Sequence, residues 1–352
     1  MPQMKKTLLV AILSAVLTLS CTERDHYVRI TGYAQGGTYA VTLNTRGAKV
    51  PAEEMRDSVE AILTLVDTTL SGYNKGSMLS RFNAGETIRP NSLFLDMYAE
   101  AYRWWTVSGG ALDFAAGPLY DAWGFGFREG EMPSGEKIAE ILRSSGMKLL
   151  RPSVPVREDG TLRWEDLLAD GVEADSIVLN YNAIAQGYTA DLVAAYLYRA
   201  GVKDMLVDIG EIWCDGLNPS RLPWAVGVDR PEDGNESPGE KIQNVWRSGG
   251  LPSGVVTSGD YRKFYVRDGR KYSHTIDPRS GHPAGSGLLS ATVVSSRSSA
   301  AADALATWCM VEGPEKAKEI ISEDPSAEGY LVFDGPDGTM AEWASEGFTS
   351  RK

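Results

Sequence analysis

A run containing Thr, Val and Val at residues 290–295 leads straight into a helical run of small residues at 299–307. The first segment predicts a buried strand, and the second predicts a helix that packs closely against it. We therefore expect a fold of class α+β, that is mixed α/β, built as a single domain with mixed sheets and flanking helices. Further expected helices cover 51–71, 92–109, 183–201 and the residues from Pro314, and further expected strands cover 205–209, 224–229, 263–266, 271–274, 330–333 and 340–343.

The N-terminus predicts export from the cytoplasm. Lys5 and Lys6 precede an apolar run from Leu8 to Leu19, which is too short for a membrane span, and Ser20-Cys21 follows. This pattern resembles a bacterial lipoprotein signal, cleaved before a cysteine that becomes acylated; the alternative is an ordinary secretory signal cut nearby. We expect a signal peptide over 1–20, a tether over 21–30 and one domain over 31–345, lipid-anchored in the cell envelope and facing the periplasm.

The chain is acidic, with a net charge of −12 over 352 residues. Cleavage after Ser20 removes Lys5 and Lys6 but no acidic residue, so the mature net charge becomes −14. This charge argues against nucleic acid as a partner. An anionic ligand would need a divalent cation, helix N-termini or a few basic side chains at its site. Cys214 and Cys309 allow one disulfide, although Cys309 lies in an apolar helical run typical of a buried thiol; with three histidines, the composition argues against a zinc site.

Asp303 and Thr307 are four residues apart on the predicted helix and therefore share one face. A carboxylate and a hydroxyl are oxygen ligands of the kind that Mg²⁺ prefers. The alternative is a solvated helix face without a ligand.

Three other segments carry polar or aromatic groups at the ends of predicted elements. Asn180 and Asn182 precede a helix that starts with small residues, where free N–H groups favour an anion; plain helix capping is the alternative. Tyr73 follows a helix end and is a candidate to stack on a flat ring, or else to pack in the core. Asp113 follows another helix end and is a candidate to bond a ring edge.

His274 and Asp260 are the candidate proton-transfer groups. His274 ends a predicted hairpin strand, and an imidazole titrates near neutral pH. Asp260 lies in Thr-Ser-Gly-Asp-Tyr and is a candidate base or metal contact, with a plain turn residue as the alternative.

Taken in order, these segments resemble the ApbE family, the FAD:protein FMN transferases of the bacterial envelope. The resemblance extends from about Gly36 to Trp343. It rests on Gly37-Thr38-Tyr39, Leu70-Ser71-Gly72-Tyr73-Asn74 with Ser80-Arg81-Phe82-Asn83, Gly110 through Asp113 with Gly117-Pro118-Leu119 and Trp123 through Gly126, Ala183-Ile184-Ala185-Gln186-Gly187, Val207 through Glu211, Ser258 through Tyr261, His274 through Gly281, and Ala302 through Thr307.

The resemblance implies a transferase that binds FAD with Mg²⁺ and moves the FMN half onto a threonine or serine hydroxyl of a target protein, releasing AMP. By position, it implies metal ligands at Asp303, Thr307 and the carbonyl of Ala183. The implied FAD contacts are Gly36, Tyr73, Ala111, Leu112, Asp113, Asn180, Gln186 and the stretch from His274 to Ile276.

Four positions depart from the family pattern. Gly36 replaces a frequent Met, Asn180 an Asp and Gln186 a Lys, and the stretch Asp208 to Glu211 lacks a second glycine. The exchanges at 180 and 186 remove one negative and one positive charge, so phosphate binding would depend on the metal and on backbone groups.

Two other functions remain open beside transfer to a protein. Water in place of the protein hydroxyl would give hydrolysis of FAD to FMN and AMP. A non-catalytic flavin-binding lipoprotein is the other alternative. For the transferase we expect as partners FAD, the membrane that holds the lipid, and an acceptor protein of a membrane redox complex.

Overall fold

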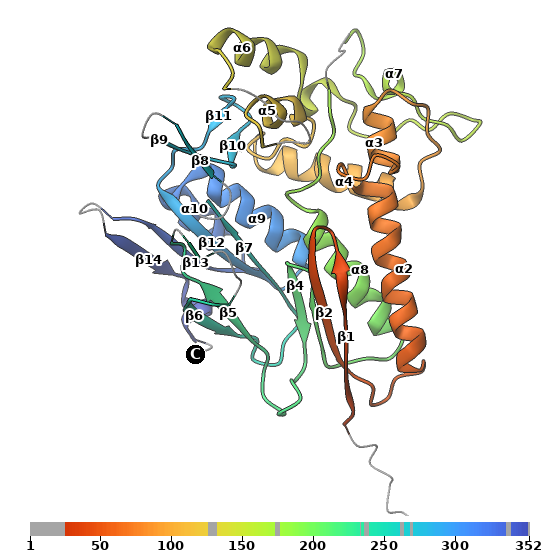
Figure 1. The fold of residues 1–352 in the computed structure, drawn as a ribbon, viewed down its shortest axis with the longest axis vertical. Helices are drawn as coiled ribbons and strands as arrows, with labels where there is room; N and C mark the ends of the chain where they lie inside the picture. The colour runs from red at the N-terminus through yellow and green to blue at the C-terminus, as the bar shows by residue number, and fades with distance from the viewer. Residues whose placement is uncertain are drawn as a thin grey trace, which may run out of the picture.

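The computed structural model describes residues 25–125, 132–172, 177–232, 234–235, 239–260, 264–267, 270–335 and 339–350. The signal peptide, Cys21, Gly126 and Tyr261 lie outside the described residues. Most of the described strands form one antiparallel sheet of eight, in the order β1-β2-β3-β4-β7-β12-β13-β14, with helices against one face (Figure 1). The strands are β1 (Tyr27–Ala34), β2 (Gly37–Asn44), β3 (Met205–Asp208), β4 (Ile212–Asp215), β7 (Ser253–Gly259), β12 (Leu288–Ser295), β13 (Ala327–Asp334) and β14 (Met340–Ala344).

Three two-stranded hairpins accompany this sheet: β5 (Ala225–Asp229) with β6 (Ile242–Arg247), β8 (Phe264–Arg267) with β9 (Arg270–Ser273), and β10 (Ile276–Asp277) with β11 (His282–Pro283). The β5–β6 hairpin contributes Trp224, Val226 and Trp246 to a buried cluster with Val255, Val294 and Val332 of the large sheet. It therefore covers part of the sheet face opposite the long helices.

The helices divide into a layer under the sheet and a second group (Figure 1). Under the sheet, α2 (Ala52–Leu70) and α8 (Ala185–Arg199) pack with β1, β2 and β3, while α9 (Ser299–Glu312) and α10 (Pro314–Glu323) pack under β7, β12 and β13. The second group gathers at the end of the molecule that carries most of the polar motifs. Its helices are α3 (Met78–Asn83), α4 (Ser92–Val107), α5 (Gly117–Ala122), α6 (Gly135–Ser144) and α7 (Trp164–Leu167), while α11 (Glu346–Ser350) ends the described chain.

The sequence periodicity explains why these elements form. In α2 the buried side chains Met55, Val59, Leu63 and Val66 keep helical spacing, and Pro51 stands just before the first turn. In α4, Asn91 caps the helix by accepting a hydrogen bond from the Phe94 amide at 2.9 Å. The predicted helices at 51–71, 92–109, 183–201 and from Pro314 are confirmed, as are the mixed fold class and the predicted strands.

The predicted tether over 21–30 ends too late. Residues 27–30 already belong to β1, which pairs along its whole length with β2. The alternation of buried Ile30 with exposed neighbours, matched by buried Val41 and Leu43 across the hairpin, makes this segment an edge strand. At the other end α11 runs to Ser350, beyond the predicted boundary at 345.

Cys214 and Cys309 are both buried thiols and belong to different core clusters, so they do not form the disulfide that the sequence allowed. The expectation of a buried Cys309 is confirmed. Within the described part of the chain, no helix combines the length and the apolar character needed to cross a membrane.

Candidate active site

The start of α9 is held between two glycines. A Cβ added to Gly187 of α8 would lie 2.6 Å from the carbonyl carbon of Ser299, and one added to Gly254 of β7 would lie 2.6 Å from its Cα. Both distances are shorter than real Cβ contacts, so neither position accepts a side chain without moving α9. The small residues at the start of α8 therefore let a second helix approach closely.

Hydrogen bonds fix α9 at the same place. The Asp191 carboxylate accepts from the amides of Ser299 and Ala300 at 2.8 and 2.9 Å, and the Ser299 hydroxyl donates to the Ile212 carbonyl at 2.6 Å. These contacts satisfy amide groups that a helix start leaves without intrahelical partners. They position the next turn of α9, which carries Asp303.

Asp303 is buried, with 5% of its surface exposed, and its Oδ2 accepts from the Gly187 amide at 3.1 Å. Burial is the main cause that raises the pKa of Asp303 to about 7; the nearby charge of Asp191 raises it further, while the Gly187 amide opposes the shift. Thr307 lies one turn later on α9 and is half-buried. The predicted shared helix face is confirmed, and the alternative of a solvated face is excluded for Asp303.

Glu211 lies near Asp303, and Asp208 lies near Glu211. Burial, followed by the charges of Asp303 and Asp208, raises the pKa of Glu211 well above its ordinary value. Burial also raises the pKa of Asp208, although Arg29 and the Gly210 amide act against it. Carboxyls grouped in this way would be stabilised in their charged form by a cation.

The three predicted metal ligands are of chemical types that suit Mg²⁺. Asp303 is a buried carboxylate, Thr307 a hydroxyl and half-buried Ala183 a carbonyl, which are all hard oxygen ligands. No group of three His, Cys, Asp or Glu side chains suited to a metal occurs among the residues that the structure describes. A single protein carboxylate supplemented by ligand phosphates is how Mg²⁺ is often held, so the metal-ligand roles stay predictions.

Tyr73 is carried by a turn that its own motif stabilises. The Asn74 amide donates to the Ser71 hydroxyl at 3.1 Å, and the Asn74 side chain donates to Asp67 at 2.6 Å. The ring of Tyr73 is 61% exposed, which excludes the alternative of a core tyrosine. Its hydroxyl accepts from the Asn182 amide nitrogen Nδ2 at 3.3 Å, so two predicted segments meet here.

The segment before α8 meets the segment after α4. The Asn180 amide donates to the Phe114 carbonyl at 2.8 Å, and the Asn180 side chain accepts from the Asn182 amide at 3.0 Å. Ala111 and Leu112 are buried at 1% and 3% exposure, and both of their amides donate to Ser108. Both oxygens of Asp113 accept from the Met147 amide, at 2.9 and 3.1 Å, and one also accepts from Ala115, which gives Asp113 a structural role.

Gly36 lies in one turn between sheet strands, and Gln186 contacts another. Gln35 and Gly36 form the tight β1–β2 turn with φ of 53° and 82°, and the Gln35 side chain donates to Thr189 of α8 at 2.6 Å. The Gln186 side chain donates to the Ile209 carbonyl at 3.3 Å, in the turn between β3 and β4. Gln186 therefore connects α8 to the turn that holds Asp208 and Glu211.

His274 and Asp260, the two candidate bases, lie close together. Nδ1 of His274 is 3.8 Å from Oδ1 of Asp260, which accepts from the Thr275 hydroxyl at 2.7 Å. His274 is the more accessible, with 37% of its side chain exposed against 13% for Asp260. Ile276 is fully buried beside Trp123, so its side chain is a core group.

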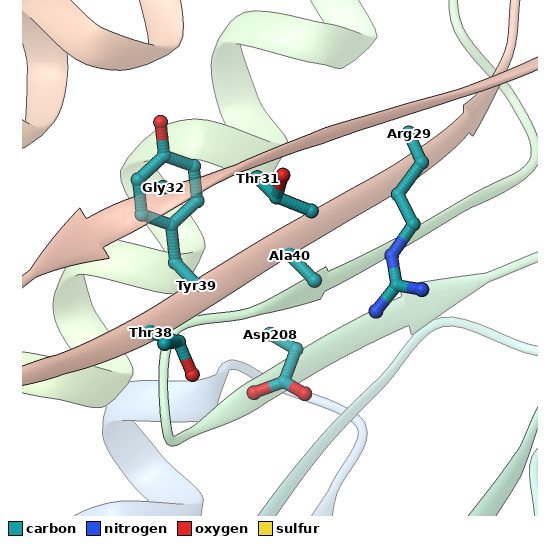
Figure 2. A pocket seen from close by; sticks show the side chains of 7 residues that line it. All are labelled: Arg29, Thr31, Gly32, Thr38, Tyr39, Ala40 and Asp208. Atoms are coloured by element: carbon teal, nitrogen blue, oxygen red, sulfur yellow. The ribbon is translucent and has the colours of Figure 1, made fainter.

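A pocket of about 360 Å³ lies on the sheet surface formed by β1, β2 and β3 (Figure 2). The Arg29 side chain extends toward the strand that carries Asp208, and Thr31, Gly32, Thr38, Tyr39 and Ala40 complete the lining of the pocket. Since Asp208 also acts on Glu211, the pocket adjoins the carboxylate cluster.

Several residues of the site were not singled out from the sequence. Asp191, Asp208 and Glu211 gave no motif of their own, although the last two lie in a stretch that carried the family resemblance. Asn83 exchanges two hydrogen bonds with the backbone of Leu179, at 2.8 and 2.9 Å, and so fixes the segment before Asn180. In the sequence, these residues appear only as polar side chains next to buried strands or helices. Ordinary turn residues look the same, so a single sequence does not identify them.

The fold and the site together define a mixed α/β domain. In it, a largely buried helix, α9, carries a carboxylate and a hydroxyl on one face. A family model described as the ApbE family matches residues 35–331. A FAD:protein FMN transferase of Vibrio cholerae is 31% identical over 346 residues, 97% of each chain, and one of Escherichia coli is 30% identical over 97% of this chain and 96% of its own. The solved apo flavinyl transferase ApbE of Pseudomonas stutzeri is 32% identical with a TM-score of 0.76, over 93% of this chain and 97% of that one.

The chain belongs to the ApbE family. The resemblance read from the motifs is thereby confirmed, and so is the fold class, because the solved relatives share this arrangement of helices and sheet.

Proposed function

We propose that this protein is a Mg²⁺-dependent FAD:protein FMN transferase that attaches FMN to a Thr or Ser hydroxyl of an envelope protein and releases AMP. Relatives with that printed name match nearly the whole chain. The observation that carries the proposal is the buried Asp303 on the face that also holds Thr307, fixed by close contacts among α8, α9 and β7. Such precise placement is what a positioning mechanism needs.

In the proposed reaction the acceptor hydroxyl oxygen attacks the phosphorus of the FMN half of FAD. The bond from that phosphorus to the AMP half breaks, AMP leaves, and the hydroxyl proton passes to a base. Asp303, Thr307 and the Ala183 carbonyl would hold Mg²⁺, which when bound neutralises the pyrophosphate charge that builds during phosphoryl transfer. The chain itself supplies positioning and needs no nucleophile of its own.

The remaining predicted contacts fit the parts of FAD by chemistry. Tyr73 offers an exposed ring for a flat heterocycle, and the backbone of the segments at 111–112 and 180–182 offers hydrogen-bonding groups. Arg29 is a cation that lines the same pocket as Asp208, and its charge acts on that carboxylate.

His274 and Asp260 are the two candidate bases, and variants distinguish them. If His274 takes the proton, His274→Gln should lower the transfer rate at pH 7 by about 100-fold and remove the acidic limb of the pH–rate profile. Asp260→Asn should then lower the rate less and keep that limb, because Asp260 acts by orienting its neighbours. The reverse pattern would assign the proton to Asp260, and the measurement is the AMP release rate from pH 5 to 9.

We further propose that Cys21 is the acylated N-terminus of the mature protein, facing the periplasm. The basic start, the apolar run and Ser20-Cys21 support this address. Globomycin, which blocks lipoprotein signal cleavage, should cause the uncleaved precursor to accumulate in the producing cells. A Cys21→Ser chain should appear in the soluble envelope fraction, whereas an unlipidated wild-type chain with another N-terminus would contradict the proposal.

Product analysis tests the proposed reaction against hydrolysis. The protein is incubated with FAD and Mg²⁺, with and without fragments of candidate envelope acceptors, and AMP and free FMN are quantified. A transferase releases AMP chiefly when an acceptor is present and leaves little free FMN. Equal amounts of AMP and free FMN with every acceptor would favour the FAD pyrophosphatase, and unchanged FAD would favour the binding protein.

A further inference from the structure

Four loops gather at the end of the fold where β1 begins, and we call them together the base. They are residues 45–51, 200–204, 216–224 and 248–252, and the first three are visible at the lower end of the molecule (Figure 1). The Lys49 amide donates to the Ala200 carbonyl at 2.7 Å, and the Leu217 amide donates to Asp204 at 3.0 Å. A Cβ on Gly250 would lie 3.7 Å from Leu217, so the fourth loop adjoins the third.

The exposed charges of the base are all positive, although the chain as a whole carries −12. They belong to Arg46, Lys49, Lys203 and Arg221. Asp204, the acidic residue of these loops, is half-buried and accepts from the Asn44 side chain and the Leu217 amide. The next exposed acids along the chain, Glu53 and Glu54, lie in the first turn of α2, where acidic side chains stabilise a helix.

The base also exposes two large apolar side chains. Leu222 is 57% exposed and Leu251 is 54% exposed, on the two loops that meet at Leu217. Single exposed leucines are common, but two beside a cationic cluster form a surface with both features of an interfacial membrane contact.

The tether starts at this same end. Tyr27, the first residue of β1, donates from its hydroxyl to the Leu217 carbonyl at 2.8 Å, and Asp25 accepts from Arg46 at 3.3 Å and from Arg221 at 2.5 Å. Cys21 is only four residues before Asp25, and four extended residues reach about 14 Å at most. A lipid on Cys21 would therefore hold the base near the surface of the bilayer.

We propose that the base is a membrane-contact surface: Leu222 and Leu251 enter the interface of an anionic bilayer while the exposed cations contact its headgroups. The inference rests on the lipid anchor of the proposed function and adds an orientation to it. One acyl anchor combined with a cationic patch gives firm membrane attachment.

This orientation sets the height of the active site. α8 runs from Ala185 beside the site to Arg199 beside the base, and its 15 residues span about 22 Å. α2 runs the other way, from the base to the turn of Tyr73, and its 19 residues span about 28 Å. The acceptor hydroxyl must therefore be presented roughly 20 to 30 Å above the membrane surface, by a domain outside the bilayer.

Fluorescence of the full, lipidated chain in vesicles tests the contact. Leu222→Cys and Leu251→Cys are labelled with a polarity-sensitive fluorophore, while Cys214 and Cys309 are buried. Phosphatidylcholine vesicles with phosphatidylglycerol should shift the emission of both labels to shorter wavelength, and phosphatidylcholine alone should shift it less. Val107→Cys, 52% exposed at the end of α4, is the matched control and should show no shift.

Charge removal provides the second measurement. Lys49→Gln and Lys203→Gln should each lower about fivefold the equilibrium constant between the membrane-contacting and the free position of the base, read from the emission of the labels. Lys137→Gln on α6 should not change it. All three should keep normal FMN transfer in detergent. If the chain binds the vesicles but the labels at Leu222 and Leu251 show no emission shift, or the label at Val107 shows an equal shift, this inference is wrong and the lipid anchor stands. If the chain does not bind the vesicles, the lipid anchor is contradicted as well.

Discussion

Asp303→Asn should retain the wild-type fold and lose FMN transfer by roughly three to four orders of magnitude. Asparagine keeps the volume of the buried side chain and an oxygen that can accept from the Gly187 amide. It removes the charge of the only carboxylate that the proposed metal site takes from the protein. Losing the metal's stabilisation of the transition state costs several kcal/mol, and each 1.4 kcal/mol is about tenfold in rate.

The measurement is AMP release at several Mg²⁺ concentrations, with melting temperatures recorded in parallel. Asp57→Asn, an exposed position on α2, is the matched control and should have wild-type activity. High Mg²⁺ should restore part of the activity of Asp303→Asn, because weakened binding is the expected defect. Near-normal activity of Asp303→Asn at limiting Mg²⁺ would show that the metal lies elsewhere.

Gly187→Ala should destabilise the protein by about 3 kcal/mol and lower its activity as well. Alanine normally favours a helix over glycine by about 1 kcal/mol, so helix propensity alone predicts the opposite sign. The new methyl group would lie 2.6 Å from the Ser299 carbonyl carbon and 2.8 Å from the Ala300 amide nitrogen, and helix backbone cannot move aside locally. Relief requires a shift of α9, which carries Asp303 and Thr307 with it.

Urea unfolding of paired variants checks this expectation. Gly135→Ala, in the first turn of α6, meets nothing within 4 Å of its new methyl group and should be neutral or slightly stabilising. Gly254→Ala should behave like Gly187→Ala, because it meets the same residue from β7. If Gly187→Ala unfolds at the wild-type urea concentration, the close packing of α8 on α9 does not position the site as described.

Local sequence patterns predicted the long elements well. The 3.6-residue spacing in α2, the proline at its start, the Asn91 cap of α4 and the turn signal between β8 and β9 each have a local physical cause, so one sequence is enough to predict them. The edge strand β1 was missed because Ile30 is its one fully buried residue and polar residues and glycine surround it, a pattern that resembles a tether until the partner strand β2 is known.

The site was predictable to the extent that its residues carry motifs. Asp303 and Thr307 follow from helix spacing, and Tyr73 from its place after a helix end. The roles of Gly187 and Asp191 depend on contacts with Ser299, more than 100 residues away in the chain, and such long-range contacts leave no local pattern. Asp113 stays a predicted ligand contact, and its carboxylate also accepts from the backbone of Met147, which no local pattern indicates.

The mass of the acceptor protein after reaction tests the central claim most directly. A soluble fragment of a candidate envelope acceptor is incubated with FAD, Mg²⁺ and either the wild-type protein or Asp303→Asn, and its intact mass and flavin fluorescence are recorded. The account predicts a gain equal to FMN less one water on a single Thr or Ser with the wild-type protein, and no gain with Asp303→Asn. Acceptors that all stay unmodified while FAD is consumed to free FMN and AMP would contradict it.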